Sequence, residues 1–179
     1  MNRAQPLPAE VRIGHVHLRV SDLARATAFY RDVLGFKLVG DGSRAGVAAT
    51  FLAAGDYHHH IALNTFESAG GTPPPPGHTG LYHFAILYPD RAALSQAVWR
   101  LFVRDYPIEG GRDHGGTVSV YLKDPDGNGL ELTYDRPRDQ WFDERGEFVL
   151  RNDRFAVCDL LDEEGTALLE RQRAAGVIN

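Results

Sequence analysis

Residues 14–22 read G-H-V-H-L-R-V-S-D, and residues 82–90 read Y-H-F-A-I-L-Y-P-D. His15 and His83 hold the same place in these two stretches and lie 68 positions apart. A pattern that returns at a fixed offset indicates an internal structural repeat. The chain is therefore predicted to contain two copies of one unit, each with a histidine on its opening strand. A site assembled from both copies could hold a metal ion.

The residues around each histidine predict a β-α-β-β-β unit. Apolar and polar residues alternate ahead of Asp22, which is typical of a half-buried strand, and Asp22 and Asp90 can each cap the helix that follows. Gly35 supplies the left-handed backbone position that ends the first helix. Strands are predicted at residues 11–20, 36–39, 46–52 and 58–66 in the first unit, and at 81–88, 118–123 and 130–134 in the second.

Residues 1–137 are predicted to form a single α+β domain made of two βαβββ modules. The first module spans residues 11–67 and the second spans residues 80–136, within a few positions. Four consecutive prolines, at positions 73–76, cannot lie in a central strand or a helix interior. Residues 68–79 are therefore interpreted as a linker between the modules.

Residues 138–179 form a C-terminal extension that follows the end of the repeat. Residues 162–174 have the spacing of a helix, but no residue of the extension suggests a chemical role. The extension is expected to cover a sheet edge or to contact another subunit.

Composition excludes several classes of partner. The chain has 179 residues, 43% of them hydrophobic, and a formal net charge of −5, which disfavours nucleic acid and anionic membranes as partners. No apolar run approaches the roughly 18 residues that span a bilayer, and residues 1–10 lack the apolar core of a signal peptide. Cys158 is the single cysteine and cannot form an internal disulfide. A soluble, cytoplasmic protein is expected.

The repeat indicates three metal ligands. The closing strands align residues 61–64 with residues 130–133, so the second unit offers Glu131 beside His15 and His83 from the opening strands. Strand alternation turns Glu131 away from its apolar neighbours and into the space between the units. Two imidazoles and one carboxylate suit iron(II), although zinc and manganese accept the same ligands. The alternative is that both histidines lie in the core and that Glu131 is a surface acid.

Several residues near this set are candidates for catalysis or substrate binding. Ala62, the counterpart of Glu131, cannot coordinate and leaves positions open for water, substrate or O₂. The run His58-His59-His60 precedes it, and histidine is suited to proton transfer near neutral pH. His114 is expected in a flexible loop ahead of the strand that carries Tyr121. The alternatives are a solvated strand end for the histidine run and a plain core aromatic for Tyr121.

The chain resembles the vicinal oxygen chelate superfamily, which includes glyoxalase, bleomycin-resistance and extradiol dioxygenase proteins. The resemblance rests on residues 14–36, G-H-V-H-L-R-V-S-D-L-A-R-A-T-A-F-Y-R-D-V-L-G-F, and on residues 124–132, D-P-D-G-N-G-L-E-L. Residues 56–66, D-Y-H-H-H-I-A-L-N-T-F, are similar to the catechol 2,3-dioxygenase branch. The resemblance implies two modules that form a cupped, incompletely closed, eight-stranded sheet around a metal site.

The resemblance also implies roles for individual residues. His15, His83 and Glu131 match the family's iron ligands, in agreement with the repeat. Tyr121 stands ten residues before Glu131, where extradiol enzymes place a tyrosine that binds substrate, and His114 resembles a histidine near it. One residue of the histidine run resembles the acid–base histidine: ungapped comparison favours His59, whereas strand alternation favours His60.

The implied function is an Fe(II)-dependent extradiol dioxygenase that cleaves a catechol-type aromatic diol with O₂. Mn(II) or another divalent metal is the alternative cofactor, and assembly into a homo-oligomer is left open. Two other functions are compatible with the sequence. One is a different metal enzyme of the same superfamily, such as a lyase, an epimerase or a thiol transferase. The other is a resistance-type protein that binds an aromatic compound without turnover.

Overall fold

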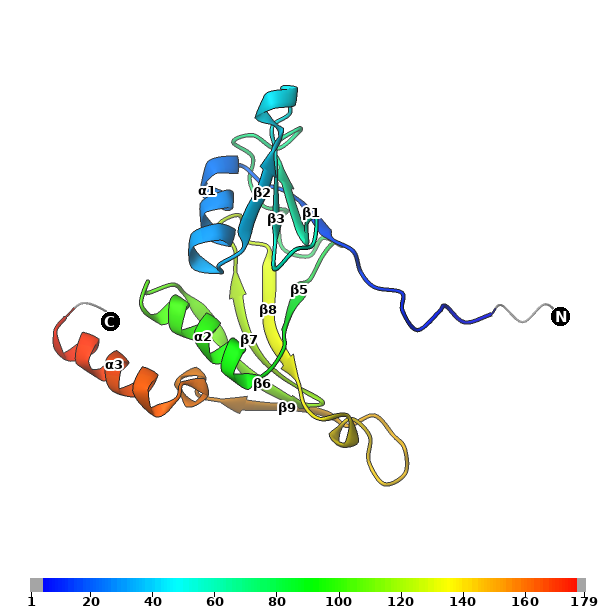
Figure 1. Ribbon diagram of the computed structural model, residues 1–179, viewed down its shortest axis with the longest axis vertical. Coiled ribbons are helices and arrows are strands. Elements are labelled where there is room, and N and C mark those ends of the chain that lie inside the picture. The colour runs from blue at the N-terminus through cyan, green and yellow to red at the C-terminus, as the bar shows by residue number, and fades with distance from the viewer. Residues whose placement is uncertain (1–4, 177–179) are drawn as a thin grey trace.

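The computed structural model describes residues 5–176, and each repeat forms one β-sheet with helical segments packed on it (Figure 1). The first module contains β1 (Val16–Arg19), α1 (Leu23–Ala28), η1 (Phe29–Val33), β2 (Lys37–Asp41), η2 (Gly42–Ala45), β3 (Ala49–Ala53) and β4 (Ile61–Asn64). The second contains β5 (Phe84–Tyr88), α2 (Arg91–Phe102), β6 (Ile108–Gly115), β7 (Thr117–Lys123) and β8 (Gly129–Asp135). The extension contains η3 (Arg138–Gln140), β9 (Leu150–Phe155), η4 (Val157–Leu160) and α3 (Glu163–Ala174).

The two sheets share one topology. Their strand orders are β1-β4-β3-β2 and β5-β8-β7-β6-β9. In each sheet the first strand pairs in parallel with the module's last strand, and the other neighbours are antiparallel. The expected α+β fold of two βαβββ modules is confirmed. Within the described residues, the extension adds a ninth strand, β9, to the eight that were expected.

The strand register makes Ala62 the counterpart of Glu131. Ala62 on β4 pairs with Phe51 on β3. In the same way, Glu131 on β8 pairs with Tyr121 on β7. The equivalent strands β2 and β6 also carry a register shift at the same relative place in their pairing with β3 and β7. The repeat is therefore conserved in the hydrogen-bonded ladder itself, and its chemical differences lie in the side chains.

Helix caps form where the sequence predicts them. The Asp22 carboxylate accepts a hydrogen bond from the backbone N–H of Arg25 at 3.0 Å, and Asp90 accepts one from that of Ala93 at 2.8 Å. Such side-chain acceptors satisfy N–H groups that have no partner inside the helix. Gly35 adopts a φ of +88° at the end of the first helical segment, as predicted.

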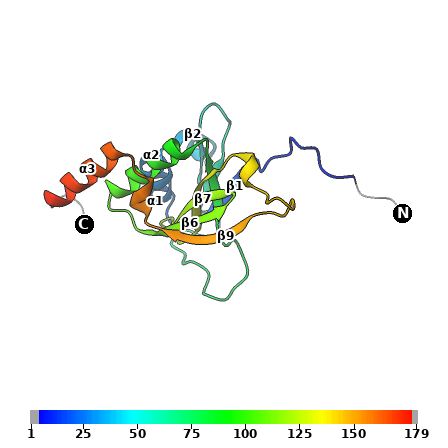
Figure 2. The same cartoon turned by 90° about the horizontal axis from the view of Figure 1, so that it is seen from below.

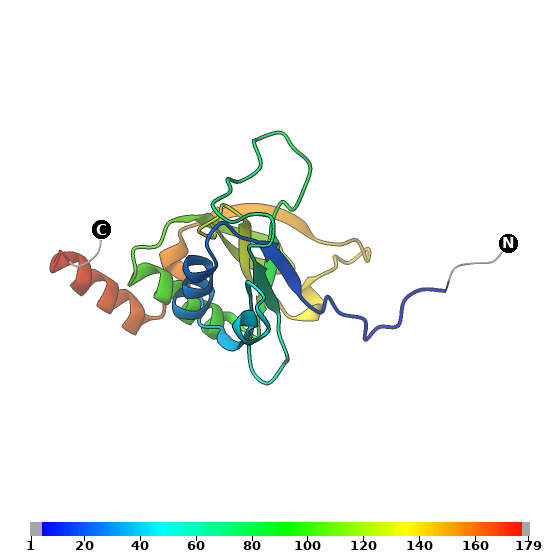
Figure 3. The same cartoon turned by 90° about the horizontal axis from the view of Figure 1, so that it is seen from above.

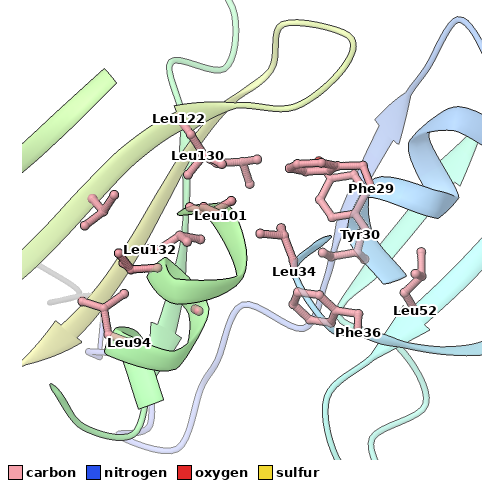
Figure 4. Packing of buried hydrophobic residues seen from close by; sticks show 14 of the residues in the cluster. Phe29, Tyr30, Leu34, Phe36, Leu52, Leu94, Leu101, Leu122, Leu130 and Leu132 are labelled. Atoms are coloured by element: carbon pink, nitrogen blue, oxygen red, sulfur yellow. The ribbon is translucent and has the colours of Figure 1, made fainter. Parts of the chain in front are cut away.

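Both helical segments lie on the same side of the sheets, and their buried faces meet in one hydrophobic core (Figures 1 and 4). Leu101 of α2 lies between the sheet residue Leu130 and the aromatic side chains Phe29 and Tyr30 of the first module (Figure 4). The opposite face of the second sheet carries the polar side chains Ser119, Glu131 and Thr133.

A polar contact also fixes the two modules to each other. The Tyr30 hydroxyl donates to the buried Asp124 carboxylate at 2.8 Å, and burial, followed by the nearby Asp124 charge, holds the pKa of Tyr30 well above its ordinary value. In the same turn, Asp126 accepts hydrogen bonds from Ser21 at 2.5 Å and from Arg25 at 2.9 Å. The turn at residues 124–129 thus anchors the first module as well as joining two strands.

The structure corrects the prediction that His114 lies in a flexible loop. His114 belongs to β6, which is paired with β7 on one side and with β9 on the other. The glycines of this segment suggested a loop, but one of them is required by packing. A Cβ on Gly111 would lie 2.6 Å from the ring of Phe155 on β9.

The strand predicted at residues 58–66 is shorter in the structure. β4 begins at Ile61, so His58, His59 and His60 precede the strand and do not alternate along it. The proline-rich linker has no helix or strand among residues 68–79 and projects away from both sheets, as Figure 3 shows.

The extension covers the outer edge of the second sheet, which is one of its two expected roles. β9 pairs antiparallel with β6 and borders the sheet (Figure 2). The chain then continues through η4 into α3, which confirms the helix predicted near residues 162–174. Leu160, Leu161 and Leu169 are buried in the common core, so the extension is part of the folded domain.

Candidate active site

The second module brings two of the three predicted metal ligands together. His83 directly precedes β5, and Glu131 lies on the neighbouring strand β8. Nε2 of His83 lies 3.0 Å from Oε2 of Glu131, and the Glu131 residue is 9% exposed. An imidazole nitrogen and a carboxylate oxygen therefore face one another at the polar side of the sheet.

Ser119 holds the other oxygen of Glu131 and was not predicted from the sequence. Its hydroxyl lies 2.5 Å from Oε1 of Glu131 and 2.9 Å from the hydroxyl of Thr133, in a fully buried position. Thr117, Ser119 and Tyr121 alternate along β7 with apolar residues that enter the core. That alternation could have identified Ser119 as a site residue from the sequence, because it places Ser119 on the same face as Tyr121.

Tyr121 and His114 form a hydrogen-bonded chain beside this pair. The Tyr121 hydroxyl lies 2.8 Å from Nε2 of His114, and Nδ1 of His114 lies 2.9 Å from the backbone carbonyl of Arg151. A carbonyl only accepts, so Nδ1 carries a hydrogen, and Nε2 of the neutral ring accepts the Tyr121 proton. Burial, followed by the nearby Glu131 carboxylate, raises the pKa of Tyr121 to about 12. Tyr121 is therefore a neutral phenol whose oxygen can still accept a hydrogen bond.

At the equivalent place in the first module, histidine side chains lie close together. His15 precedes β1, and its ring centroid lies 4.6 Å from that of His59. The His59 ring also lies 5.3 Å from that of Phe51. Desolvation, followed by the charges of His15 and other histidines nearby, lowers the pKa of His59. His17 pairs in register with Ala62, its ring centroid lies 6.4 Å from that of His15, and the Asn64 side-chain amide donates to its Nε2 at 2.8 Å.

The geometry separates the two candidates in the histidine run. His60 accepts a hydrogen bond from the Ala54 backbone N–H at 3.3 Å and packs on Tyr57, with ring centroids 4.7 Å apart. His58 also packs on Tyr57 and is exposed. Of the three, His59 is the residue whose ring contacts His15. Alternation from Ala62, which favoured His60, does not apply because the run lies before β4.

At equivalent positions, the second module carries polar side chains and the first module carries apolar ones. Glu131, Tyr121 and Ser119 of the second module correspond in register to Ala62, Phe51 and Ala49 of the first. Ala62 is 1% exposed and lies on the face of β4 opposite the core residues Ile61 and Leu63. The first module thus keeps its histidine but replaces the carboxylate and both hydroxyls with apolar groups.

His83, Tyr121 and His114 line a cavity of about 790 Å³. This volume is in the range of small-molecule sites. The lining residues come from the second module and from β9, rather than from both modules as the sequence suggested. No helix within residues 5–176 is long and apolar enough to cross a membrane.

The residues present fit a metal ion in part. Within residues 5–176, no three His, Cys, Asp or Glu side chains lie close enough together to form a metal-binding group. His83 and Glu131 nevertheless point their donor atoms at each other at 3.0 Å. These are ligand types that iron(II) shares with other divalent metals. His15 occupies the position equivalent to His83, and its participation stays a prediction.

Comparison with known proteins gives a consistent picture. The sequence model of the Glyoxalase/Bleomycin resistance protein/Dioxygenase superfamily matches residues 12–132. Catechol-2,3-dioxygenase of Bacillus subtilis (strain 168) is 43% identical over 107 residues, which cover 60% of this chain and 37% of that protein. Biphenyl-2,3-diol 1,2-dioxygenase 3 of Rhodococcus globerulus is 37% identical over 128 residues, which cover 69% of this chain and 63% of that protein. The chain thus aligns with less than two thirds of either relative.

A solved structure extends the comparison to a second activity. Lactoylglutathione lyase from Agrobacterium tumefaciens superposes on the chain with a TM-score of 0.53 and 28% sequence identity. The superposition covers 71% of this chain and 94% of that one. Both dioxygenases and lyases are therefore similar to this chain, and the side chains of the site must distinguish between them.

Proposed function

Because the chain belongs to the Glyoxalase/Bleomycin resistance protein/Dioxygenase superfamily, we propose that it is an Fe(II)-dependent extradiol dioxygenase that cleaves a catechol-type aromatic diol with O₂. One observation carries the proposal: the His83–Glu131 pair lies beside the hydrogen-bonded Tyr121 and His114. Two of the relatives are named as dioxygenases of aromatic diols, which supports this substrate class.

In this proposal, His15, His83 and Glu131 hold the metal. A divalent ion held by these residues would supply Lewis acidity and would bring the diol and O₂ together. Ser119 fixes one Glu131 oxygen at 2.5 Å and leaves the other directed at His83. A ligand held in this way is already oriented before the metal arrives.

Tyr121 and His114 orient the substrate. Because the Tyr121 proton is directed to His114, the phenol oxygen can accept a hydrogen bond from a hydroxyl of the diol. The Arg151 carbonyl fixes the His114 ring at 2.9 Å, so the acceptor does not turn away. His59, beside His15 and with a lowered pKa, is suited to move the proton of the reaction.

Ala62 separates this function from the lyase alternative. A second carboxylate at this position would add a ligand and a base, which a lyase of this superfamily is expected to need. Alanine supplies neither. Its cross-strand partner Phe51 also lacks the hydroxyl that Tyr121 carries at the equivalent place in the second module. Retention of His15, His83 and Glu131 likewise argues against a protein that binds aromatic compounds without turnover.

The direct test is ring cleavage by the full chain. The protein would be purified without oxygen, loaded with iron(II) and mixed with a set of catechols in aerated buffer. We expect a yellow ring-fission product from at least one catechol, dependent on both iron and O₂. Tight catechol binding with no product in any metal-loaded sample would contradict the proposal and favour sequestration.

The histidine run gives a second prediction. Replacing His59 with alanine should slow ring cleavage by about 10²–10⁴-fold, the range typical of a lost proton-transfer group. His60→Ala is the matched control, since His60 faces Ala54 and Tyr57, and its turnover should stay near that of the parent. Iron content and steady-state rates would be measured for both. If His59→Ala retains parental turnover, the acid–base role belongs elsewhere, with His114 as the next candidate.

A further inference from the structure

Strand β9 places residues of the C-terminal extension at the candidate active site. The superfamily match ends at residue 132, before this strand begins at Leu150. Leu150, Arg151 and Asn152 line the same cavity as His83, Tyr121 and His114. The extension is therefore positioned to contribute to substrate choice in a way that the two modules alone cannot.

The charge of this cavity is unbalanced. Its charged lining residues, apart from the histidines, are Glu109, Arg112, Lys123 and Arg151. Glu109 lies 3.8 Å from Lys123, so these two compensate each other. Neither Arg112 nor Arg151 forms an ion pair with a described carboxylate within 4.0 Å. Arg112 and Arg151 thus line the cavity without a carboxylate partner at ion-pair distance, although Nη1 of Arg112 donates to the Gly111 carbonyl at 2.9 Å and the charge of Arg151 helps to lower the pKa of Asp113.

Both arginines are placed next to the groups that would hold the diol. Arg112 alternates with His114 along β6 and lies close enough to Tyr121 for its charge to oppose the rise in the pKa of that phenol. Arg151 holds His114 through its backbone carbonyl, which leaves the guanidinium free of that task. Guanidinium groups bind carboxylates through paired hydrogen bonds, so they suit a planar anion.

We propose that Arg112 and Arg151 select an aromatic diol that carries an anionic substituent, with a carboxylate on a short side chain as the preferred group. This inference rests on the proposed function and names its substrate class. The diol end of the molecule lies toward His83 and Tyr121, and the anionic end lies toward β6 and β9. The extension thereby contributes a specificity-determining residue, Arg151.

The test uses three catechols with one ring and different charge: 3,4-dihydroxyphenylacetate, its neutral amide and the cationic dopamine. The iron-loaded chain should show a kcat/KM for the carboxylate about tenfold above that for the amide, with the amine lowest, because a charge-assisted pair is stronger than a neutral one. Arg151→Met should remove most of this preference by raising the KM of the carboxylate more than that of the amide. The side-chain change leaves the backbone carbonyl that orients His114 in place.

Arg19→Met is the control. Arg19 lies on β1 of the first module, pairs with Glu67 at 3.1 Å and does not line the cavity, so its substitution should leave the charge preference unchanged. Binding of the carboxylate and the amide would also be measured by calorimetry without O₂, at low and high salt. The carboxylate should bind more tightly, and added salt should weaken its binding selectively.

The two measurements separate the inference from the proposed function. Equal kcat/KM for carboxylate and amide, unchanged by Arg151→Met, would overturn the inference while ring cleavage stands. Conversely, the chain could cleave no catechol yet bind the carboxylate preferentially, with the preference lost in Arg151→Met. In that case the inference on the anionic ligand stands, and the proposed dioxygenase function fails.

Discussion

Replacing Glu131 with alanine should abolish stoichiometric metal binding and, with it, ring cleavage. Among residues 5–176, Glu131 is the carboxylate that pairs with His83, and Ser119 holds it in place at 2.5 Å. Losing the ligand itself should weaken metal binding by more than the roughly 10–100-fold typical of losing a hydrogen-bond partner of a ligand. His114→Ala, which removes the hydrogen-bond partner of Tyr121 and leaves all three proposed ligands in place, should therefore cost less metal affinity than Glu131→Ala. Metal content would be measured by elemental analysis after dialysis against a buffered metal solution.

Glu109→Ala is the matched control for Glu131→Ala. Both carboxylates lie on the second sheet, but Glu109 is exposed and pairs with Lys123 at 3.8 Å rather than with a histidine. Its loss should leave metal content at the parental level. Glu131→Gln, which keeps the size of the side chain, shows whether any loss arises from charge or from a packing defect. Parental metal content in a folded Glu131→Ala variant would remove Glu131 from the ligand set.

The repeat was the part of the fold most accessible from the sequence. Strand pairing and pleating are periodic, so residues at one offset in two copies occupy equivalent ladder positions. His15 and His83 lie 68 positions apart, and the separate alignment of the closing strands pairs Ala62 with Glu131 at 69, so both correspondences follow without coordinates. The caps at Asp22 and Asp90 were accessible for a similar reason, because capping depends on local residue types.

Other features of the fold and the site depend on contacts between segments far apart in the chain, and the sequence shows no periodic pattern that predicts them. β6 is rich in glycine and resembled a loop, and its pairing partner β9 lies in the extension outside the repeat. The choice between His59 and His60 stays a prediction: strand alternation favoured His60, but the run precedes β4, and the ring of His59 contacts His15. The Arg151 carbonyl that holds His114 is a backbone group, so the identity of residue 151 could not predict this hydrogen bond.

Ala62 offers the sharpest test of the relation between the two modules. Its register position equals that of Glu131, and it lies 1% exposed on the face opposite the core. Its neighbours differ from those of Glu131, because Phe51 and Ala49 stand where Tyr121 and Ser119 lie in the second module. A carboxylate introduced here would therefore have no hydroxyl partner, and it would be costly to bury unless a cation lies within reach.

Ala62→Glu should bind metal more tightly than the parent and show little or no dioxygenase activity. The new carboxylate would add a fourth protein ligand and a negative charge, occupying a position needed by the diol or O₂ and repelling an anionic substrate. Metal affinity would be measured by competition with a chelator, and ring cleavage by the absorbance of the product. Ala62→Gln introduces an uncharged side chain of the same size as glutamate. This variant should lose activity through bulk alone and gain no metal affinity, so the difference between the two variants reports the effect of the charge.

A stably folded Ala62→Glu variant with parental activity and parental metal affinity would mean that position 62 does not face the metal. The open coordination positions would then need an origin other than the loss of a carboxylate from the first module.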